Sequence, residues 1–136
     1  MPSLMKFPSA EWAAALYAAL NANAEYAEAA RQWEGDILLR VTAASAGGVA
    51  PGVHLELEHG ACRGATFEPD SSAVSSEFVF EGSAENWGKL IRREVDPVGA
   101  IMNGTIRVKG NLAKLMRFTR AAKILVETAG AIPVDP

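Results

Sequence analysis

The spacing of apolar residues changes twice along this chain, and this change limits the possible folds more than any other feature of the sequence. Apolar side chains recur every three or four residues over 9–33, alternate with polar ones over most of 37–81, and return to the longer spacing over 83–126. The longer spacing places apolar side chains on one face of a helix, whereas alternation places them on one face of a strand. The chain is therefore predicted to be an α+β protein in which helices precede and follow the strands along the sequence.

Two helices are predicted in the alanine-rich stretch near the N-terminus. Ser9 provides a capping hydroxyl, and Trp12, Leu16 and Leu20 then follow at intervals of four residues as one apolar face. A second helical pattern covers 24–33 and ends close to a glycine. Both helices are expected to pack on the sheet through their apolar faces.

Four strands are predicted in the middle of the chain, over 37–41, 53–57, 62–68 and 77–81. The first two are joined by 47–52, which is dense in turn residues, so they are expected to form a hairpin. Taken in order, the four strands predict a mainly antiparallel meander.

The second half of the chain predicts three more helices and a fifth strand. Ser83 caps the first of these helices, and a short one covers 97–102 after an Asp-Pro pair. Residues 105–109 alternate as the last strand. One continuous helix over 112–126 then presents a wide apolar face, which must cover an apolar surface.

Length and composition predict a single domain over 1–136. A chain of this length, with 49% hydrophobic and 21% charged residues, can bury a core without disulfides or metal. Within it we expect N-terminal helices over 9–33, the sheet and remaining helices over 36–128, and a short tail over 129–136.

Net charge, cysteine content and hydropathy limit which partners and which cellular compartment we expect for this protein. The formal net charge of −3 argues against nucleic acid, which requires a clustered basic surface. Cys62 is the single cysteine, so no internal disulfide can form, as suits a reducing compartment. The N-terminal residues lack the apolar run of a signal peptide, and no apolar stretch reaches the roughly 20 residues of a membrane helix. We therefore expect a soluble, cytoplasmic protein.

The second half also carries an ordered set of motifs. In sequence order these are Phe78-Val79-Phe80, Ser83 to Trp87, Leu90-Ile91, Asp96-Pro97, Ile101-Met102, Gly104, Ile106 to Leu112 and Leu115-Met116. With these motifs the chain resembles the sterol carrier protein type 2 family, also called non-specific lipid-transfer domains. Many members have Gly-Asp in place of Gly110-Asn111, and asparagine is an equally competent helix cap.

The resemblance is strong over Val74 to Val126 and weaker upstream, where only the order of helices and strands agrees. It implies that the whole chain is one such domain. It further implies an about five-stranded, mostly antiparallel sheet covered by helices, with an apolar tunnel between sheet and helices that holds acyl chains, sterols or related lipids.

Eleven residues are predicted to bind the ligand in this tunnel. They are mostly large apolar side chains from the motif-bearing half: Phe78, Phe80, Trp87, Leu90, Ile101, Met102, Leu115, Met116, Phe118, Thr119 and Leu125. Methionine suits such a site because its unbranched side chain adapts to different ligands. Core packing would account for any one of these residues, so only the resemblance argues for a cavity.

No catalytic, metal or cofactor site is predicted. His54, His59 and Cys62 are zinc-binding residue types, but an odd spacing on a strand directs the two histidines to opposite faces. Cys62 is expected to be a partly buried, inert thiol because no helix N-terminus precedes it. No Gly-x-Ser-x-Gly elbow occurs in the sequence.

Three functions remain open at this point. The favoured one is non-catalytic carriage of a fatty acyl chain, acyl-CoA, sterol or isoprenoid-like lipid. The alternative is an accessory subunit that presents a lipid-like substrate to partner enzymes. Processing of an ester or thioester is ranked last and would require Cys62, His54 and His59 to converge.

Two polar features could assist a lipid carrier. Lys109-Gly110-Asn111 could hold a lipid head group, although helix capping explains it better. A basic stripe, formed by Lys114, Arg117, Arg120 and Lys123 with Arg92 and Arg93 nearby in sequence, could contact an anionic membrane transiently, or could be an ordinary solvated face.

Overall fold

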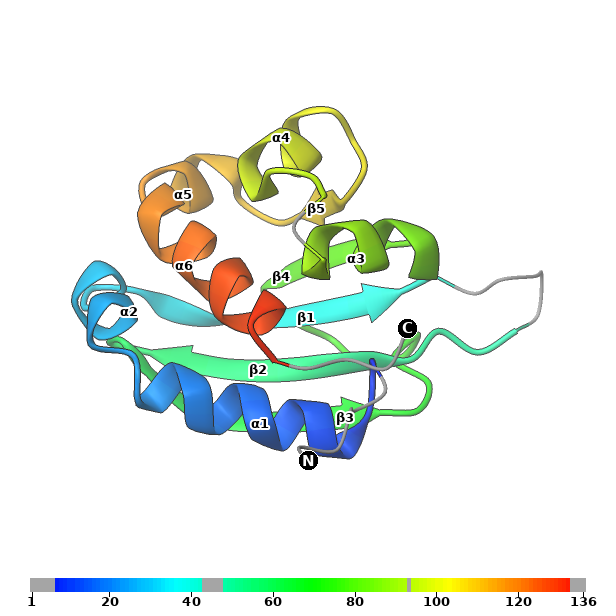
Figure 1. Ribbon diagram of the computed structural model, residues 1–136, viewed down its shortest axis with the longest axis horizontal. Helices are drawn as coiled ribbons and strands as arrows, with labels where there is room; N and C mark the ends of the chain where they lie inside the picture. The colour runs from blue at the N-terminus through cyan, green and yellow to red at the C-terminus, as the bar shows by residue number, and fades with distance from the viewer. Residues whose placement is uncertain (1–6, 43–47, 93, 133–136) are drawn as a thin grey trace.

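The computed structural model describes residues 7–42, 48–92 and 94–132 and shows one sheet with helices packed on it (Figure 1). The strands are β1 Glu34–Val41, β2 Gly52–Glu58, β3 Ala61–Glu68, β4 Phe78–Gly82 and β5 Arg107–Lys109. The helices are α1 Ala10–Asn21, α2 Ala24–Ala29, α3 Ala84–Ile91, α4 Pro97–Met102, α5 Leu112–Met116 and α6 Thr119–Gly130. The predicted α+β class with a five-stranded sheet is confirmed.

The strand order corrects the predicted meander. The order is β3-β2-β1-β4-β5, with β1 and β4 parallel and the other three pairings antiparallel. The sheet is thus mostly antiparallel, but β4 lies beside β1 instead of β3. β1 is central because Ile37, Leu38 and Leu39 are all buried, which requires cover on both faces.

The connection from β3 to β4 crosses the outer face of the sheet to reach β1. Ser71 anchors this connection: its hydroxyl donates to the Ala50 carbonyl at 2.7 Å, and the Arg40 guanidinium donates to the Ser71 carbonyl at 2.9 Å. This crossing covers the side of β1 that the helices do not, and it makes the parallel pairing of β1 with β4 possible.

The inner face of the sheet is covered by helices. α1 packs along β3 through Trp12, Leu16 and Leu20, as their spacing predicts, and α3 packs on β4 (Figure 1). α6 contacts each of the other five helices and is the centre of the helical layer. In the described part of the chain the longest helices have 12 residues, so none has the length or hydropathy to cross a bilayer.

Side-chain caps begin most of the helices. The side chains of Ser9, Asn23, Ser83, Asp96 and Asn111 each accept a hydrogen bond from the backbone N–H three residues later. The caps predicted at Ser9, Ser83, Asp96 and Asn111 are therefore confirmed.

The helices differ from the predictions at three places. α2 ends at Ala29, and the predicted continuous helix over 112–126 is split into α5 and α6. α6 also runs to Gly130, past the predicted end and into the first two residues of the predicted tail over 129–136. Phe118 stands at the break, where its ring packs edge-on against Trp33 at 5.1 Å between centroids. Leu115 before the break and Phe118 at the break both pack into the core, as they would on one continuous helix, so the apolar pattern of the sequence does not reveal the break.

The predicted hairpin of the first two strands is confirmed by the register, which places Ile37 opposite Leu55. Of its connecting segment, 43–47 lies outside the described residues, as does 133–136 of the predicted tail.

Candidate ligand-binding site

An apolar pocket lies where α4, α5 and α6 meet β4, and we call it the outer pocket. Its cavity volume is about 40 Å³. Six of the predicted ligand-binding residues line it: Phe80, Ile101, Met102, Leu115, Met116 and Thr119. Leu112, Ala122, Lys123 and Val126 complete the lining and were not predicted.

The outer pocket opens to solvent through three apolar side chains, which we call the mouth residues. Met102 is 75% exposed, Met116 58% and Leu112 51%. Three large apolar side chains therefore lie exposed beside one apolar pocket. Met102 lies on α4, whose N-terminus is capped by Asp96, and Leu112 and Met116 lie on α5, whose N-terminus is capped by Asn111.

A second cavity, of about 20 Å³, lies beneath α5 and α6, and we call it the Trp33 pocket. It contains the predicted residues Leu115, Phe118 and Leu125, together with Tyr26 and Trp33. Leu115 belongs to this pocket and to the outer pocket, so single side chains separate the two.

A third cavity, also of about 20 Å³, lies between α1, α3 and α6, and we call it the Trp12 pocket. The predicted residues Phe80, Trp87, Leu90 and Leu125 line it. Phe80 and Val126 are shared with the outer pocket. The predicted set is therefore spread over three neighbouring cavities, while Phe78 lines none of them and packs against the Trp33 ring.

These cavities are too small in volume to be the predicted tunnel. Binding sites for small molecules have volumes of roughly 300–1,000 Å³, against about 40 Å³ in the outer pocket. An acyl chain requires lining side chains to shift and join the cavities. The tunnel and the roles of its lining residues therefore remain predictions.

The turn before α5 is held by backbone geometry and capping. Gly110 has a φ of 136°, and a Cβ there would come within 2.5 Å of the Phe78 ring, so the position requires glycine. Asn111 accepts from the Lys114 N–H, and Lys109 pairs with Glu81 at 3.5 Å. These contacts support the capping interpretation of Lys109-Gly110-Asn111.

Lys114 is not part of a solvated basic stripe, because its ammonium is held by protein groups. Its ammonium donates to the Glu34 carbonyl at 2.6 Å and to the Glu77 carboxylate at 2.9 Å. It also lies 5.1 Å from the centre of the Trp33 ring, a cation–π distance. Lys114 therefore ties α5 to β1 and to the residue before β4. Arg92, Arg117, Arg120 and Lys123 are exposed as predicted, and Arg93 lies outside the described residues.

The residues considered for thiol catalysis do not converge. Cys62 is buried on the inner face, opposite Leu57 in the register, whereas His54 alternates with Val53 and Leu55 and so faces the other side. Burial raises the pKa of the Cys62 thiol to about 11, which leaves it a weak nucleophile at neutral pH. This agrees with the predicted inert thiol, although the side chain is more fully buried than expected.

His54 instead forms a pair with Asp36 at 2.6 Å. The second carboxylate oxygen of Asp36 accepts from the Glu77 N–H at 2.9 Å. Partial burial acts to raise the pKa of Asp36, but the hydrogen bonds from Glu77 and His54 outweigh it and the pKa is lowered. Asp36 thus joins β1, β2 and the start of β4.

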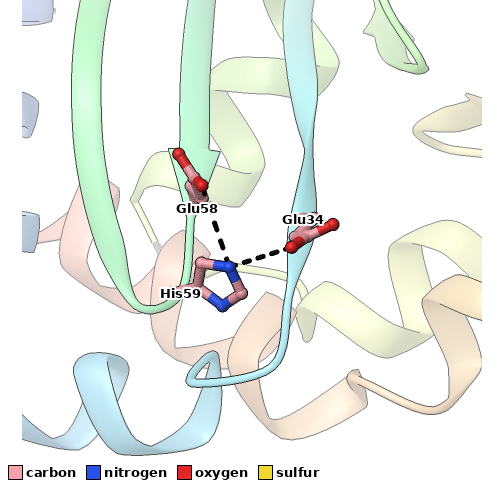
Figure 2. Close-up of side chains that lie close together, drawn as sticks. All are labelled: Glu34, Glu58 and His59. Atoms are coloured by element: carbon pink, nitrogen blue, oxygen red, sulfur yellow. Dashed lines mark ion pairs between the residues drawn. The ribbon is translucent and has the colours of Figure 1, made fainter.

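His59 lies in a different group of side chains, with Glu34 and Glu58 (Figure 2). The two carboxylates belong to residues that face each other across β1 and β2, and the His59 ring lies between them, at 2.9 Å from Glu34 and 3.8 Å from Glu58. Their ligand atoms lie within 4.8 Å of one another, close enough to share a metal ion. All three are exposed, and an ion pair explains the arrangement equally well. Neither Cys62 nor His54 takes part.

The fold and the pockets define a class: an α+β domain whose helices enclose apolar cavities against a five-stranded mixed sheet. The chain belongs to the SCP-2 sterol transfer family, whose model matches residues 15–123. The resemblance inferred from the motifs is confirmed, and the match extends upstream into α1.

Solved structures agree with this assignment. A crystal structure of sterol carrier protein 2 is 32% identical over 93% of this chain and 99% of its own, with a TM-score of 0.86. The solution structure of a conserved hypothetical protein from Thermus thermophilus is also 32% identical, over 99% of this chain and 95% of its own, with a TM-score of 0.84. Sterol carrier protein 2 from Aedes aegypti, in complex with palmitate, shares the fold at 13% identity, over 86% of this chain and 96% of its own, with a TM-score of 0.50. No protein with a curated function matches the chain.

Proposed function

We propose that this protein binds and carries an apolar ligand between its sheet and its helices, and that it catalyses no reaction. The observation that carries the proposal is the outer pocket, which opens to solvent through the exposed mouth residues Met102, Leu112 and Met116. Membership of a sterol transfer family supports it.

The ligand we propose is a fatty acyl chain, acyl-CoA, sterol or isoprenoid-like lipid. The Aedes aegypti structure holds palmitate, so the fold can accommodate an acyl chain. Burying about 10 methylene groups contributes roughly 8 kcal/mol before association costs of at least about 4 kcal/mol. A purely apolar site would therefore bind modestly, which suits a carrier that must release its ligand.

Ligand entry would proceed by displacement of side chains. Met102 and Met116 are unbranched and exposed, so they can swing aside at little cost. Phe80 and Leu115 separate the outer pocket from the two inner pockets, and their rotation would join the three cavities. The eleven predicted residues, apart from Phe78, would then line one continuous space.

Native mass spectrometry of the freshly purified protein, with organic extraction, tests the proposal first. We expect a stoichiometric apolar ligand. A protein that is purified empty and also fails to bind a fluorescent fatty acid would contradict carriage. A search for partner enzymes would then follow.

A pocket-filling variant tests the location of the site. Ala122 lines both the outer pocket and the Trp33 pocket, so Ala122→Phe should weaken binding of the fluorescent fatty acid at least about tenfold by occupying that space. Ala18→Phe, the same change on the exposed side of α1, is the control and should leave binding unchanged. Equal affinities in two folded variants, checked by circular dichroism, would place the ligand elsewhere.

A further inference from the structure

His59 lies in the turn between β2 and β3, and the segment between α2 and β1 holds its ring. Nδ1 lies 3.1 Å from the Arg31 carbonyl oxygen, which can only accept a hydrogen bond, so Nδ1 carries a proton and donates it. The backbone N–H of His59 donates to the Trp33 carbonyl at 2.7 Å. The other ring nitrogen, Nε2, is therefore fixed in direction and faces the carboxylates of Glu34 and Glu58 (Figure 2).

Carboxylates face one another across β1 and β2 at two neighbouring positions on one face of the sheet. Glu34 is directly opposite Glu58, and two residues along, Asp36 is opposite Glu56. Like charges directly opposite each other on adjacent strands destabilise a sheet. Asp36 is paired with His54 at 2.6 Å. A cation between Glu34 and Glu58 would stabilise the other position in the same way.

The three side chains in Figure 2 are spaced as the ligands of one metal ion. Nε2 of His59 lies 2.9 Å from a Glu34 oxygen and 3.8 Å from a Glu58 oxygen, and all three atoms lie within 4.8 Å of one another. Ligand atoms about 2.1 Å from a zinc ion lie roughly 3.0–3.4 Å apart when they are neighbours in its shell. The second oxygen of Glu58 faces Arg63 at 3.7 Å, so the first oxygen is the one that would bind.

A proton and a metal ion would use this group of side chains differently. A proton on Nε2 serves one acceptor, and Glu34 is within hydrogen-bond distance of Nε2 whereas Glu58 is not. A metal ion would bind all three ligands and offset both carboxylate charges. A histidine that binds a metal through one nitrogen commonly donates its other N–H to a carbonyl or carboxylate, as His59 does to Arg31.

We propose that His59, Glu34 and Glu58 bind a divalent transition metal ion, for which Zn²⁺ is the best fit. One imidazole and two carboxylates suit zinc, whereas Ca²⁺ and Mg²⁺ are bound through oxygen atoms. Glu34 and Glu58 also line an open polar hollow of about 290 Å³, which has room for the water molecules that complete the shell. None of the three residues lines the outer pocket, so the metal site is independent of lipid carriage.

Calorimetric titration of the untagged, EDTA-treated protein with ZnCl₂ tests the proposal, and we expect one ion per chain. His59→Asn removes a ligand but suits the turn, because residue 59 has a φ of 50° and precedes Gly60, and Asn-Gly favours such turns. It should weaken Zn²⁺ binding at least about tenfold. His54→Gln changes the other histidine of the chain and should alter the Zn²⁺ affinity less than about threefold.

Two carboxylate variants distinguish a ligand from a nearby negative charge. Glu58→Gln should weaken Zn²⁺ binding at least about tenfold. Glu56→Gln removes the same charge from the same face of β2, two residues away, and should weaken binding less than about threefold, since it acts only through the electrostatic field. Equal losses in the two variants would show that the acidic surface attracts the ion without a defined set of ligands, and would overturn the proposal.

Long-range ¹H–¹⁵N NMR spectra of the unmutated protein give a readout that does not depend on a variant folding. On addition of Zn²⁺ the Nε2 resonance of His59 should shift while its Nδ1 keeps the proton, and the resonances of His54 should stay in place. If Zn²⁺ does not bind, or if only the His54 resonances shift, the proposal is wrong and a proton is the cation between the two carboxylates. Either result leaves lipid carriage intact, because binding of the fluorescent fatty acid is measured separately.

Discussion

At the scale of single residues, Lys114 attaches α5 to the sheet through three kinds of contact. Its ammonium bonds a carbonyl of β1, pairs with a carboxylate next to β4, and lies over an aromatic ring. The side chain is only partly exposed, so these contacts are less screened than those of a surface pair. Lys114 thereby fixes the base of the helix that carries two of the mouth residues.

Removal of the Lys114 ammonium should therefore destabilise the protein. Lys114→Met keeps the apolar stem but leaves the Glu34 carbonyl and the Glu77 carboxylate without this donor, so we expect a loss of about 1–2 kcal/mol in the free energy of unfolding. Arg117→Met, on a neighbouring exposed side chain, is the control and should change it by less than about 0.5 kcal/mol. Urea unfolding measures both, and equal effects would show that the Lys114 contacts add no stability.

Between elements, the pairing of β1 with β4 decides the topology. The sequence allowed prediction of the strands, most caps and the hairpin, because these depend on local spacing and on short-range hydrogen bonds. It did not allow prediction of which strand β4 would join, since alternation within a strand says nothing of its neighbour. The buried run Ile37-Leu38-Leu39 was the available signal, because a strand covered on both faces belongs at the centre of a sheet.

Asp36 links the elements at this junction and makes their stability depend on pH. Its lowered pKa means that the folded state favours the carboxylate, so the stabilisation is present above the unfolded pKa, about 3.9. The stabilisation is lost as the pH falls through the still lower folded pKa.

Asp36→Asn should consequently unfold at lower urea concentration than the unmutated protein at neutral pH, and the difference should shrink below about pH 4. Glu25→Gln, a change of an exposed carboxylate on α2, serves as the control and should show no comparable difference at either pH. A gap between Asp36→Asn and the unmutated protein that stayed constant down to about pH 2 would show that the Asp36 charge does not contribute.

At the scale of the whole molecule, the motif-bearing half of the sequence predicted the family and most of the candidate site. Six predicted residues meet in the outer pocket because α4, α5 and α6 follow one another in sequence. Leu112, Ala122 and Val126 were missed as lining residues, because helical spacing identifies an apolar face but not which part of it remains unfilled.

The exposed cations near the outer pocket suggest how the whole molecule meets a membrane. We propose that Arg120 and Lys123, two exposed cations of α6 of which Lys123 lines the outer pocket, attract an anionic bilayer while the mouth residues contact its apolar interior. Each cation near such a surface contributes about 1 kcal/mol. The protein as a whole has a net charge of −3, so attraction depends on this side facing the membrane.

Vesicle pelleting tests this orientation. The protein should pellet with vesicles rich in phosphatidylserine more than with phosphatidylcholine vesicles, and the difference should fall as salt is raised. Arg120→Ser with Lys123→Ser should weaken binding to the anionic vesicles at least about tenfold, because roughly 2 kcal/mol of attraction is removed. Arg31→Ser with Arg63→Ser removes the same charge from exposed positions outside the lining of the outer pocket and should have a smaller effect. If both double variants lose binding equally, net charge alone governs the attraction and the mouth residues do not face the membrane; if the unmutated protein binds both vesicle types weakly and alike, this chain does not use a bilayer as its loading surface.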